Sequence, residues 1–152
     1  KIMSFIIMLF MLNLSIGDSY ISNESVIEIG AYNIRYDSDN YLIDIYASND
    51  KSIAGFQFEI IGQDFEILDV DGGRAKRSGF TFYNGKRGVI LAFSLEGKLI
   101  SPVNDVYKKM NPLLTITTRK KTSVPSELNF KTLIAGEKGI KLESSFIPIY
   151  ID

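Results

Sequence analysis

Hydrophobic and polar residues alternate with a period of two from Val26 to the C-terminus, and turn-forming residues interrupt the alternation about every eight to twelve positions. This pattern is typical of short strands that bury one face, and a helical period is nearly absent. The sequence therefore predicts an all-β fold, a two-sheet antiparallel β-sandwich of about nine strands. We expect strands at residues 26–35, 41–48, 53–61, 65–71, 80–83, 89–94, 113–119 and 128–133, and at 140–142 or 146–151.

The alternation also assigns faces to individual strands. In the strand at 41–48, Ile43, Ile45 and Ala47 share one face, which we expect in the core, whereas Asp44 and Tyr46 share the other. The same rule predicts a sandwich interior closed by Phe56, Phe58, Ile60, Val89, Leu91 and Phe93. Asn84-Gly85, between two apolar runs, predicts a tight hairpin because both residues tolerate positive φ.

The length of 152 residues fits one domain large enough to bury a stabilising core, so the absence of cysteine is no obstacle to folding. Residues 1–17 stand apart from this domain. Lys1 precedes the apolar run 2–12, which is shorter than the roughly 20 residues of a membrane-spanning helix, and small residues follow at Ser15 and Gly17. We expect residues 1–17 to be a secretory signal peptide and residues 18–152 the mature domain, secreted or on the cell surface. A buried N-terminal strand and a membrane anchor are the alternatives.

The composition limits the kinds of catalytic and metal site that the chain can form. The chain has no His and no Cys, which excludes Ser-His-Asp and Cys-His nucleophilic sites and removes the usual ligands of zinc. Its 17 basic residues are scattered among 18 acidic ones, so nothing indicates nucleic-acid binding. We expect no enzymatic activity and no cofactor.

Carboxylates are the remaining catalytic candidates. Asp44 and Glu59 lie on polar strand faces, and their spacing does not show that they converge on a cleft, as a glycosidase would need. Asp69 and Asp71, followed by Gly72-Gly73, resemble half of a calcium loop whose later acidic ligand is missing. A glycine turn that ends a strand is the favoured interpretation, with Asp69 and Asp71 as a weak metal candidate.

Two surface features remain open. Asn23 begins an Asn-Glu-Ser glycosylation sequon, which matters only in a eukaryotic source. Exposed tyrosines could stack on sugars or form a protein interface, although packing at strand ends explains them as well. The tyrosines considered are Tyr20, Tyr32, Tyr36, Tyr41, Tyr46, Tyr83 and Tyr107.

A family resemblance begins at residues 53–60, IAGFQFEI, which resemble a strand signature of cohesin domains. It continues through Gly72-Gly73-Arg74-Ala75, GFTF at 79–82 and VILAFSLEGKLI at 89–100, and covers about half of the chain. The resemblance implies a jelly-roll sandwich related to carbohydrate-binding modules. The residues that carry this signature, expected in the core, are Ala54, Gly55, Phe56, Phe58, Gly79, Phe80 and Phe93.

The resemblance also implies a function. Cohesins bind calcium-loaded dockerin modules through a sheet face and so anchor polysaccharide-degrading enzymes outside the cell. We therefore expect a protein partner of dockerin type, bound by an exposed strip on the strands at 89–94 and 113–119. Residues flanking the predicted hairpin are the expected contacts: Tyr83, Asn84, Arg87 and Glu96. A carbohydrate-binding module with a polysaccharide ligand and a structural or adhesive surface domain are the alternatives.

Overall fold

The alternating pattern forms twelve strand segments in the part of the chain that the computed structural model describes, residues 26–85, 87–103 and 107–152. The strands are β1 Ile27–Asp37, β2 Asn40–Ser48, β3 Ile53–Ile60, β4 Phe65–Asp71, β5 Thr81–Gly85, β6 Val89–Phe93, β7 Leu114–Lys120, β8 Ser126–Leu128, β9 Phe130–Gly136, β10 Lys141–Leu142, β11 Ser144–Ile147 and β12 Ile149–Ile151. Two single helical turns, α2 Gly73–Arg77 and the 3-10 turn η1 Glu137–Gly139, join them. Both candidate C-terminal segments are strands, where the sequence left a choice between them.

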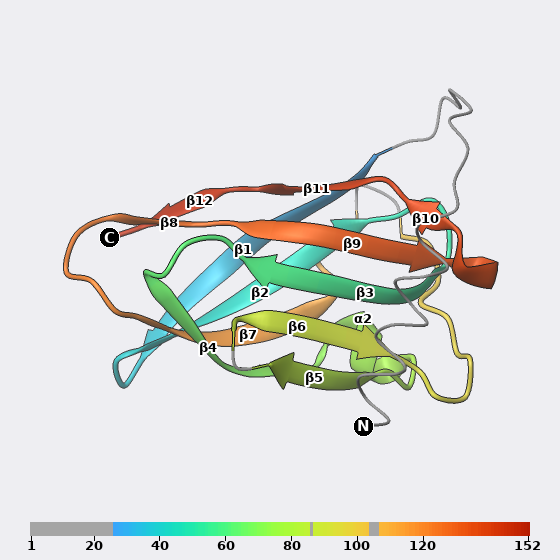
Figure 1. Ribbon diagram of the computed structural model, residues 1–152, viewed down its shortest axis with the longest axis horizontal. Coiled ribbons are helices and arrows are strands. Elements are labelled where there is room, and N and C mark those ends of the chain that lie inside the picture. The colour runs from blue at the N-terminus through green and yellow to red at the C-terminus, as the bar shows by residue number, and fades with distance from the viewer. Residues whose placement is uncertain (1–25, 86, 104–106) are drawn as a thin grey trace.

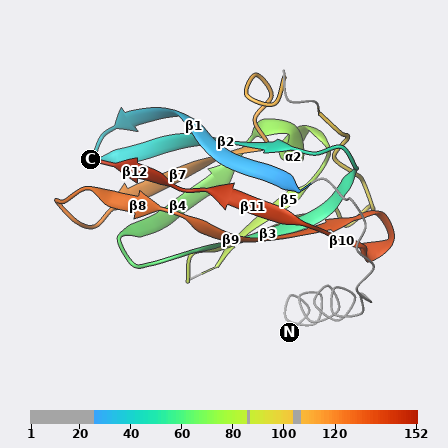
Figure 2. The same ribbon diagram turned by 90° about the horizontal axis from the view of Figure 1, so that it is seen from above.

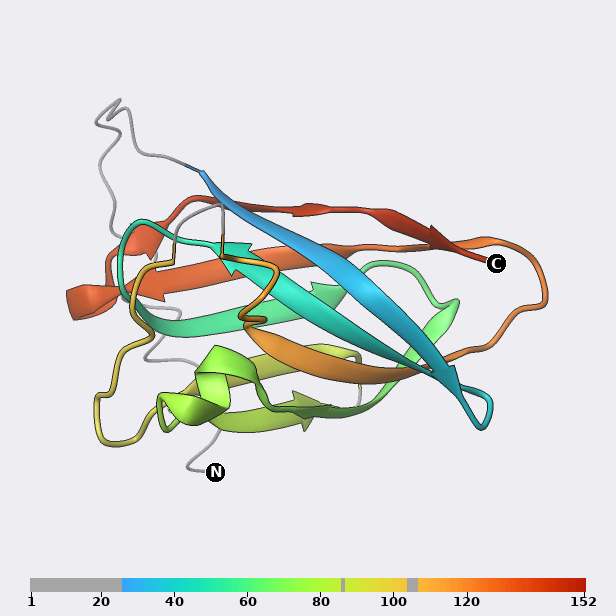
Figure 3. The same ribbon diagram turned by 180° about the vertical axis from the view of Figure 1, so that it is seen from behind.

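Two five-stranded sheets pack face to face (Figures 1 and 2). The β1 sheet has the order β11-β1-β2-β7-β4, and the β3 sheet has the order β10-β9-β3-β6-β5. Figure 1 views the molecule from the β3 sheet, and Figure 3 views it from the β1 sheet. The predicted two-sheet β-sandwich is confirmed. Among the described strands, the β1–β11 pair is parallel and the other pairs are antiparallel.

The two long edges of the sandwich differ. β8 and β9 are separated only by Asn129, and β11 and β12 only by Pro148, so each pair is one interrupted strand. β9 belongs to the β3 sheet and β11 to the β1 sheet, while β12 pairs with β8. These strands close one edge, where the hydroxyls of Thr132 and Ser144 lie 2.8 Å apart. At the other edge β4 and β5 are each the last strand of their sheet.

Aromatic side chains connect the sheets through the core. Phe58 on β3 lies 6.3 Å from Phe130 on β9, and Phe130 lies 5.1 Å from Phe146 on β11, measured between ring centroids. Phe56 and Phe80 pack beside them and are buried, as the sequence predicted. The predicted inward face of β2 is also confirmed, because Ile43, Ile45 and Ala47 are buried.

The predicted faces of β6 are wrong. Ile90 and Ala92 are fully buried opposite Phe58 and Phe56, so Val89, Leu91 and Phe93 lie on the outer face of the β3 sheet. Phe93 is therefore not a core residue. Both faces of β6 are apolar, and a period of two cannot tell which one is inside until the register with β3 is known.

Other signature residues also lie outside the core. Gly79 is exposed and has a φ of 81°, which serves the turn after α2 rather than core packing. Gly55 is buried on the outer side of β3, opposite Phe93, and Ala54 is half-buried at a register shift. The predicted glycine turn after β4 is confirmed, because Gly72 and Gly73 both have positive φ.

No helix within the described residues is long and apolar enough to cross a membrane. The predicted signal peptide, residues 1–17, and the predicted sequon at Asn23 lie outside the described part of the chain.

Candidate functional site

A row of side chains crosses the outer face of the β3 sheet. Phe56 and Phe58 point into the core, so Gln57 between them points outward. Gln57 pairs with Leu91 on β6 and with Leu133 on β9, and Leu91 pairs in turn with Tyr83 on β5. The row Tyr83–Leu91–Gln57–Leu133 therefore spans four neighbouring strands.

Apolar residues dominate the centre of this face. We call them the outer strip: Tyr83, Val89, Leu91, Phe93 and Leu133. The rings of Tyr83 and Phe93 are stacked, with centroids 5.3 Å apart and an interplanar angle of 16°. Leu91 is only 4% exposed although it faces away from the core.

Polar residues surround the outer strip. The outward register positions next to it are Thr81 on β5, Glu59 on β3, Lys131 on β9 and Lys141 on β10. An apolar centre with buried anchors and a polar rim is the usual anatomy of a protein interface. A two-faced apolar strand such as β6 is otherwise hard to explain in a sheet that has water on one side.

The β5–β6 hairpin brings three of the four predicted partner-binding residues to one end of the sandwich. Tyr83 belongs to the outer strip, while Asn84 faces the other way and its amide donates to the carbonyl of Ile67 at 3.2 Å. Arg87 is exposed in the turn. Glu96 is exposed beyond the far end of β6, where its backbone N–H donates to the Ser94 hydroxyl. The structure does not bring Glu96 together with the other three.

The expected binding strip included the strand at 89–94, but its side chains Leu91 and Phe93 were assigned to the core, and Leu133 was not considered. The other strand of the expected strip, 113–119, lies in the other sheet. The signal that could have identified Leu91 and Phe93 is the pair of apolar faces on β6, since a strand with water on one side needs only one. Which face is outside depends on pairing with β3, about 30 residues earlier in the chain, and the alternation within β6 carries no information about it.

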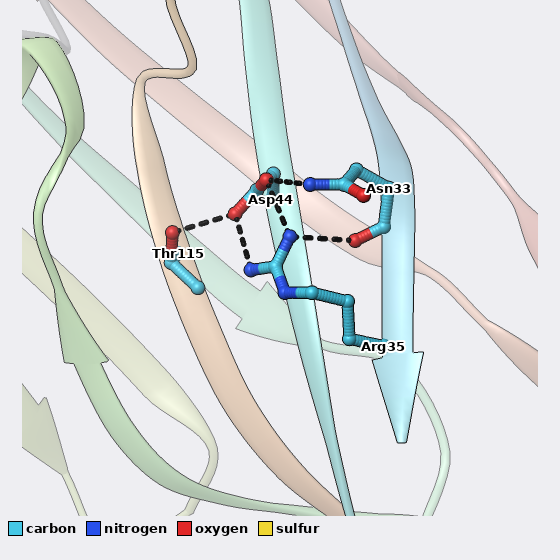
Figure 4. A network of polar contacts seen from close by, with 4 residues as sticks. All are labelled: Asn33, Arg35, Asp44 and Thr115. Carbon is cyan, nitrogen blue, oxygen red and sulfur yellow. Dashed lines mark hydrogen bonds and ion pairs between the residues drawn. The ribbon is translucent and has the colours of Figure 1, made fainter. Parts of the chain in front are cut away.

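The outer face of the β1 sheet holds a polar network instead (Figure 4). Asp44 on β2 accepts two hydrogen bonds from the Arg35 guanidinium, at 2.9 and 3.0 Å. It accepts a third from Asn33 at 2.6 Å and a fourth from the Thr115 hydroxyl on β7 at 2.7 Å. The Arg35 hydrogen bond, with support from Thr115 and Asn33, lowers the pKa of Asp44 to about 2.

A bulge in β1 builds this network. The register with β2 shifts between Tyr32 and Ile34, and Asn33 has a φ of 50°. A bulge inserts an extra residue and redirects the side chains beside it. Asp44 is buried, and its four hydrogen bonds occupy both carboxylate oxygens, so it fixes neighbouring side chains rather than titrating as a general acid.

The paired carboxylates considered from sequence do not form a catalytic pair. Asp44 lies on the outer face of the β1 sheet and Glu59 on the outer face of the β3 sheet, so the core separates them. Asp71 forms an ion pair with Lys76 at 2.7 Å, and hydrogen bonds from Lys76 and the Gly72 backbone lower its pKa. Asp69 is exposed on the same strand, and the described residues contain no group of three or more potential metal ligands.

The tyrosines are distributed over both sheets. Of those described, Tyr83 is the one on the outer face of the β3 sheet. Tyr46 lies across Gly30 on the β1 sheet, beneath the amino groups of Lys108 and Lys109 at 5.1 and 5.6 Å from its ring centroid. The others do not form one aligned platform: Tyr32 contacts Tyr46, Tyr36 contacts Tyr41, and Tyr107 is exposed in a loop. Tyr20 lies outside the described residues.

The comparison with known proteins identifies the fold of the chain. No protein-family model and no curated protein matches the sequence. Among solved structures, a non-cellulosomal cohesin from the hyperthermophilic archaeon Archaeoglobus fulgidus is similar, with a TM-score of 0.57 and 14% identity over 83% of this chain and 89% of that one. The reeler domain of human F-spondin matches with a TM-score of 0.42 and 12% identity, over 87% of this chain and 98% of that one. The chain therefore has the cohesin-like β-sandwich fold that its sequence motifs predicted.

Proposed function

We propose that this chain is a non-catalytic module that docks a protein partner through the outer strip. The observation that carries the proposal is Leu91, an apolar side chain buried on the water-facing side of a sheet and flanked by a stacked aromatic pair. A partner would contact the half-buried side chains around Leu91, namely Tyr83, Val89, Phe93 and Leu133, and would remove their remaining apolar surface from water.

The fold favours a dockerin-type partner. The similar Archaeoglobus fulgidus structure is described as a non-cellulosomal cohesin, which shows that the fold occurs outside cellulosomes. We propose that this module assembles proteins outside the cell, in an assembly that can include polysaccharide-degrading enzymes. Export rests on the basic and apolar character of residues 1–17.

A polysaccharide ligand is the second candidate, and the stacked rings of Tyr83 and Phe93 favour it. Aromatic rings on a sheet face bind sugars by stacking. Here the two rings face each other at 5.3 Å, which engages one face of each ring and leaves less flat surface for a sugar. Protein docking therefore explains the strip better.

The test is affinity capture with a matched pair of variants. The purified protein is immobilised, exposed with calcium to the secreted proteins of its source, and eluted with a chelator; the eluate is identified by mass spectrometry. Leu133→Lys places a charge in the outer strip, and Thr117→Lys places the same charge on the outer face of the β1 sheet, also at a half-buried position. We expect a protein with duplicated calcium loops, retained by wild type and Thr117→Lys and bound at least tenfold more weakly by Leu133→Lys, a loss of about 1.4 kcal/mol.

Two results would contradict the proposal. Undiminished retention of the partner by Leu133→Lys would place the interface elsewhere, and equal loss with both variants would show that the effect is not specific to the outer strip. Retention of a polysaccharide, and of no protein, by the folded domain would favour the carbohydrate-binding candidate.

A further inference from the structure

A cleft lies at the open edge of the sandwich, between β4 and β5. Its volume is about 680 Å³, within the range of sites that bind small ligands or short peptide segments. The β3–β4 turn and β4 form one wall, and the β5–β6 hairpin forms the other; both turns lie at the same end of the molecule (Figure 1). Ile60, Phe65 and Ile67 supply apolar lining between polar residues at the rim.

Hydrogen bonds fix both walls. Asn84 joins β5 to β4 through the carbonyl of Ile67, and the backbone N–H of Ile60 donates to Gly88 at 2.9 Å. Gly88 has a φ of 68°, and a Cβ at this position would overlap the side chain of Ile60. The bond from Ile60 therefore holds Gly88, the residue that follows Arg87, beside the end of β3.

The charge of the cleft is unbalanced. Arg87 and Lys121 both line it, and neither forms an ion pair in the described structure. Glu66 is the carboxylate among the described lining residues, and it already lies 3.7 Å from Arg119. The cleft is therefore lined by two cations, Arg87 and Lys121, and by one carboxylate, Glu66, whose charge is already paired with Arg119.

We propose that this cleft binds an acidic segment of the protein partner, with Arg87 and Lys121 pairing its carboxylates. The inference deepens the proposed function and rests on it for the class of occupant. Arg87 offers a planar fork that suits a carboxylate, and Lys121 adds a second charge across the cleft. The partner is then a protein that carries acidic residues beside the apolar surface that covers the outer strip.

Two features favour a peptide over an acidic sugar. β4 and β5 are terminal strands, and an extended chain can add to a sheet edge beyond the point where Asn84 bonds to the Ile67 carbonyl. The cleft is also continuous with the outer strip, because its lining residue Gly85 pairs with Val89 of the strip. One partner can therefore occupy both surfaces.

The experiment measures the cleft without a natural partner. The ¹⁵N-labelled protein is titrated with pentaglutamate, with pentaglutamine as the uncharged control and with an oligogalacturonate as the acidic sugar. We expect pentaglutamate to shift the backbone amides of Ile67, Gly85, Gly88 and Lys121. Arg87→Gln and Lys121→Gln each weaken its binding by about threefold, and by about tenfold together. Lys138→Gln makes the same charge change at an exposed position in η1 and leaves binding unchanged.

The proposal is overturned if pentaglutamate shifts no amide around the cleft, if its binding survives both substitutions, or if oligogalacturonate binds the cleft more tightly than the peptide. Circular dichroism confirms that the exposed-site variants remain folded. Because no natural partner is used, failure of the cleft to take an acidic peptide and failure of the outer strip to capture a protein are separate results.

Discussion

Asp44 shows at the scale of one residue how a polar face can stabilise a sandwich. Its carboxylate is buried and accepts hydrogen bonds from three side chains on two neighbouring strands. Its pKa, about 2 when folded, is below the usual value of about 4 that it regains on unfolding. The ionised form is therefore favoured by folding, and the stabilisation is present above pH 4 or so and is lost as pH falls toward 2.

We accordingly expect Asp44→Asn to lower the free energy of unfolding by about 2 kcal/mol at pH 7. The difference from wild type should shrink as pH falls from about 4 to 2, because wild-type Asp44 then becomes protonated as well. Urea denaturation at a series of pH values measures both effects. Asp71→Asn is the control, since Asp71 and its partner Lys76 are both more than half exposed and solvent screens such a pair. A pH-independent difference between wild type and Asp44→Asn would contradict the assignment.

Arg74 in α2 is a second buried polar residue, and it holds three segments together. Its guanidinium donates to the carbonyls of Ser101 and Ala47 at 2.9 and 2.8 Å and to the Asn49 side chain at 2.9 Å. Burial, and the nearby charge of Arg77, lower its pKa to about 10. Of its side-chain nitrogens, Nε is buried without a hydrogen-bond partner. Among the described residues, the buried charge of Arg74 is thus stabilised by neutral hydrogen-bond acceptors and not by a carboxylate.

Replacement of Arg74 by Met should destabilise the fold by about 2 to 4 kcal/mol, because it leaves these buried acceptors unpaired. Arg77→Met removes the same charge from an exposed position of the same helical turn, and we expect a change below about 0.5 kcal/mol. Thermal or chemical denaturation of both variants is sufficient. Equal effects of the two substitutions would show that the Arg74 hydrogen bonds contribute little.

The sequence could not predict these two residues as structural. Asp44 alternates correctly with Ile43 and Ile45, so its placement on the outer face was right, but its burial depends on a bulge at Asn33 and on Thr115 some 70 residues later. Arg74 follows two glycines and looks like a loop cation. Neither contact leaves a periodic signal, because periodicity reports the face of a residue and not its partners.

At the scale of elements, the pairing of β1 with β2 includes one close approach between a glycine and an aromatic ring. The Tyr46 ring lies over Gly30, where an added Cβ would be 2.5 Å from the hydroxyl oxygen and 2.6 Å from Cζ. Gly30→Ala should therefore destabilise the fold by about 1 to 3 kcal/mol. In the Tyr46→Ala background the same substitution should cost at least about 1 kcal/mol less, because the obstructing ring is gone.

A double-mutant cycle by chemical denaturation measures this coupling. Gly85→Ala is the matched control, since its added Cβ would meet Val89 at the ordinary distance of 3.4 Å and it does not touch Tyr46. Additive effects of Gly30→Ala and Tyr46→Ala would mean that the ring moves aside at no cost.

The inward-facing residues were predicted correctly for strands with one apolar face and wrongly for the strand with two apolar faces. β2 and β3 have one apolar and one mixed face, and their inward residues were assigned correctly. β6 has two apolar faces, and the wrong one was placed in the core. The binding strip was expected on this strand, but the error left its side chains unidentified: Tyr83 was named for its place in a hairpin, whereas its stacking partner Phe93 was assigned to the interior. Pairing of β1 with β11 joins the two ends of the domain, and no local pattern reports it.

At the scale of the whole molecule, aromatic residues that look alike in sequence lie in two different places, one set between the sheets and the other on an outer face. Phe58 lies in the chain of rings that connects the sheets, whereas Phe93 lies in the outer strip. Phe58→Ala should lower the free energy of unfolding by about 3 to 5 kcal/mol, because it opens a cavity between the sheets. Phe93→Ala removes a half-buried ring at the surface and should cost less than half as much.

The two substitutions should affect binding of the partner in the opposite order. At a temperature where both variants are folded, Phe93→Ala should weaken capture of the partner, while Phe58→Ala should leave it close to the wild-type level, because Phe58 does not reach the outer face. Denaturation and calorimetric titration on the same three proteins give both orders. If Phe58→Ala weakened binding as much as Phe93→Ala did, the outer strip would be only a part of the fold's packing. Opposite orders in the two measurements would show that the molecule keeps its stability between the sheets and its partner recognition on the outer face of one of them.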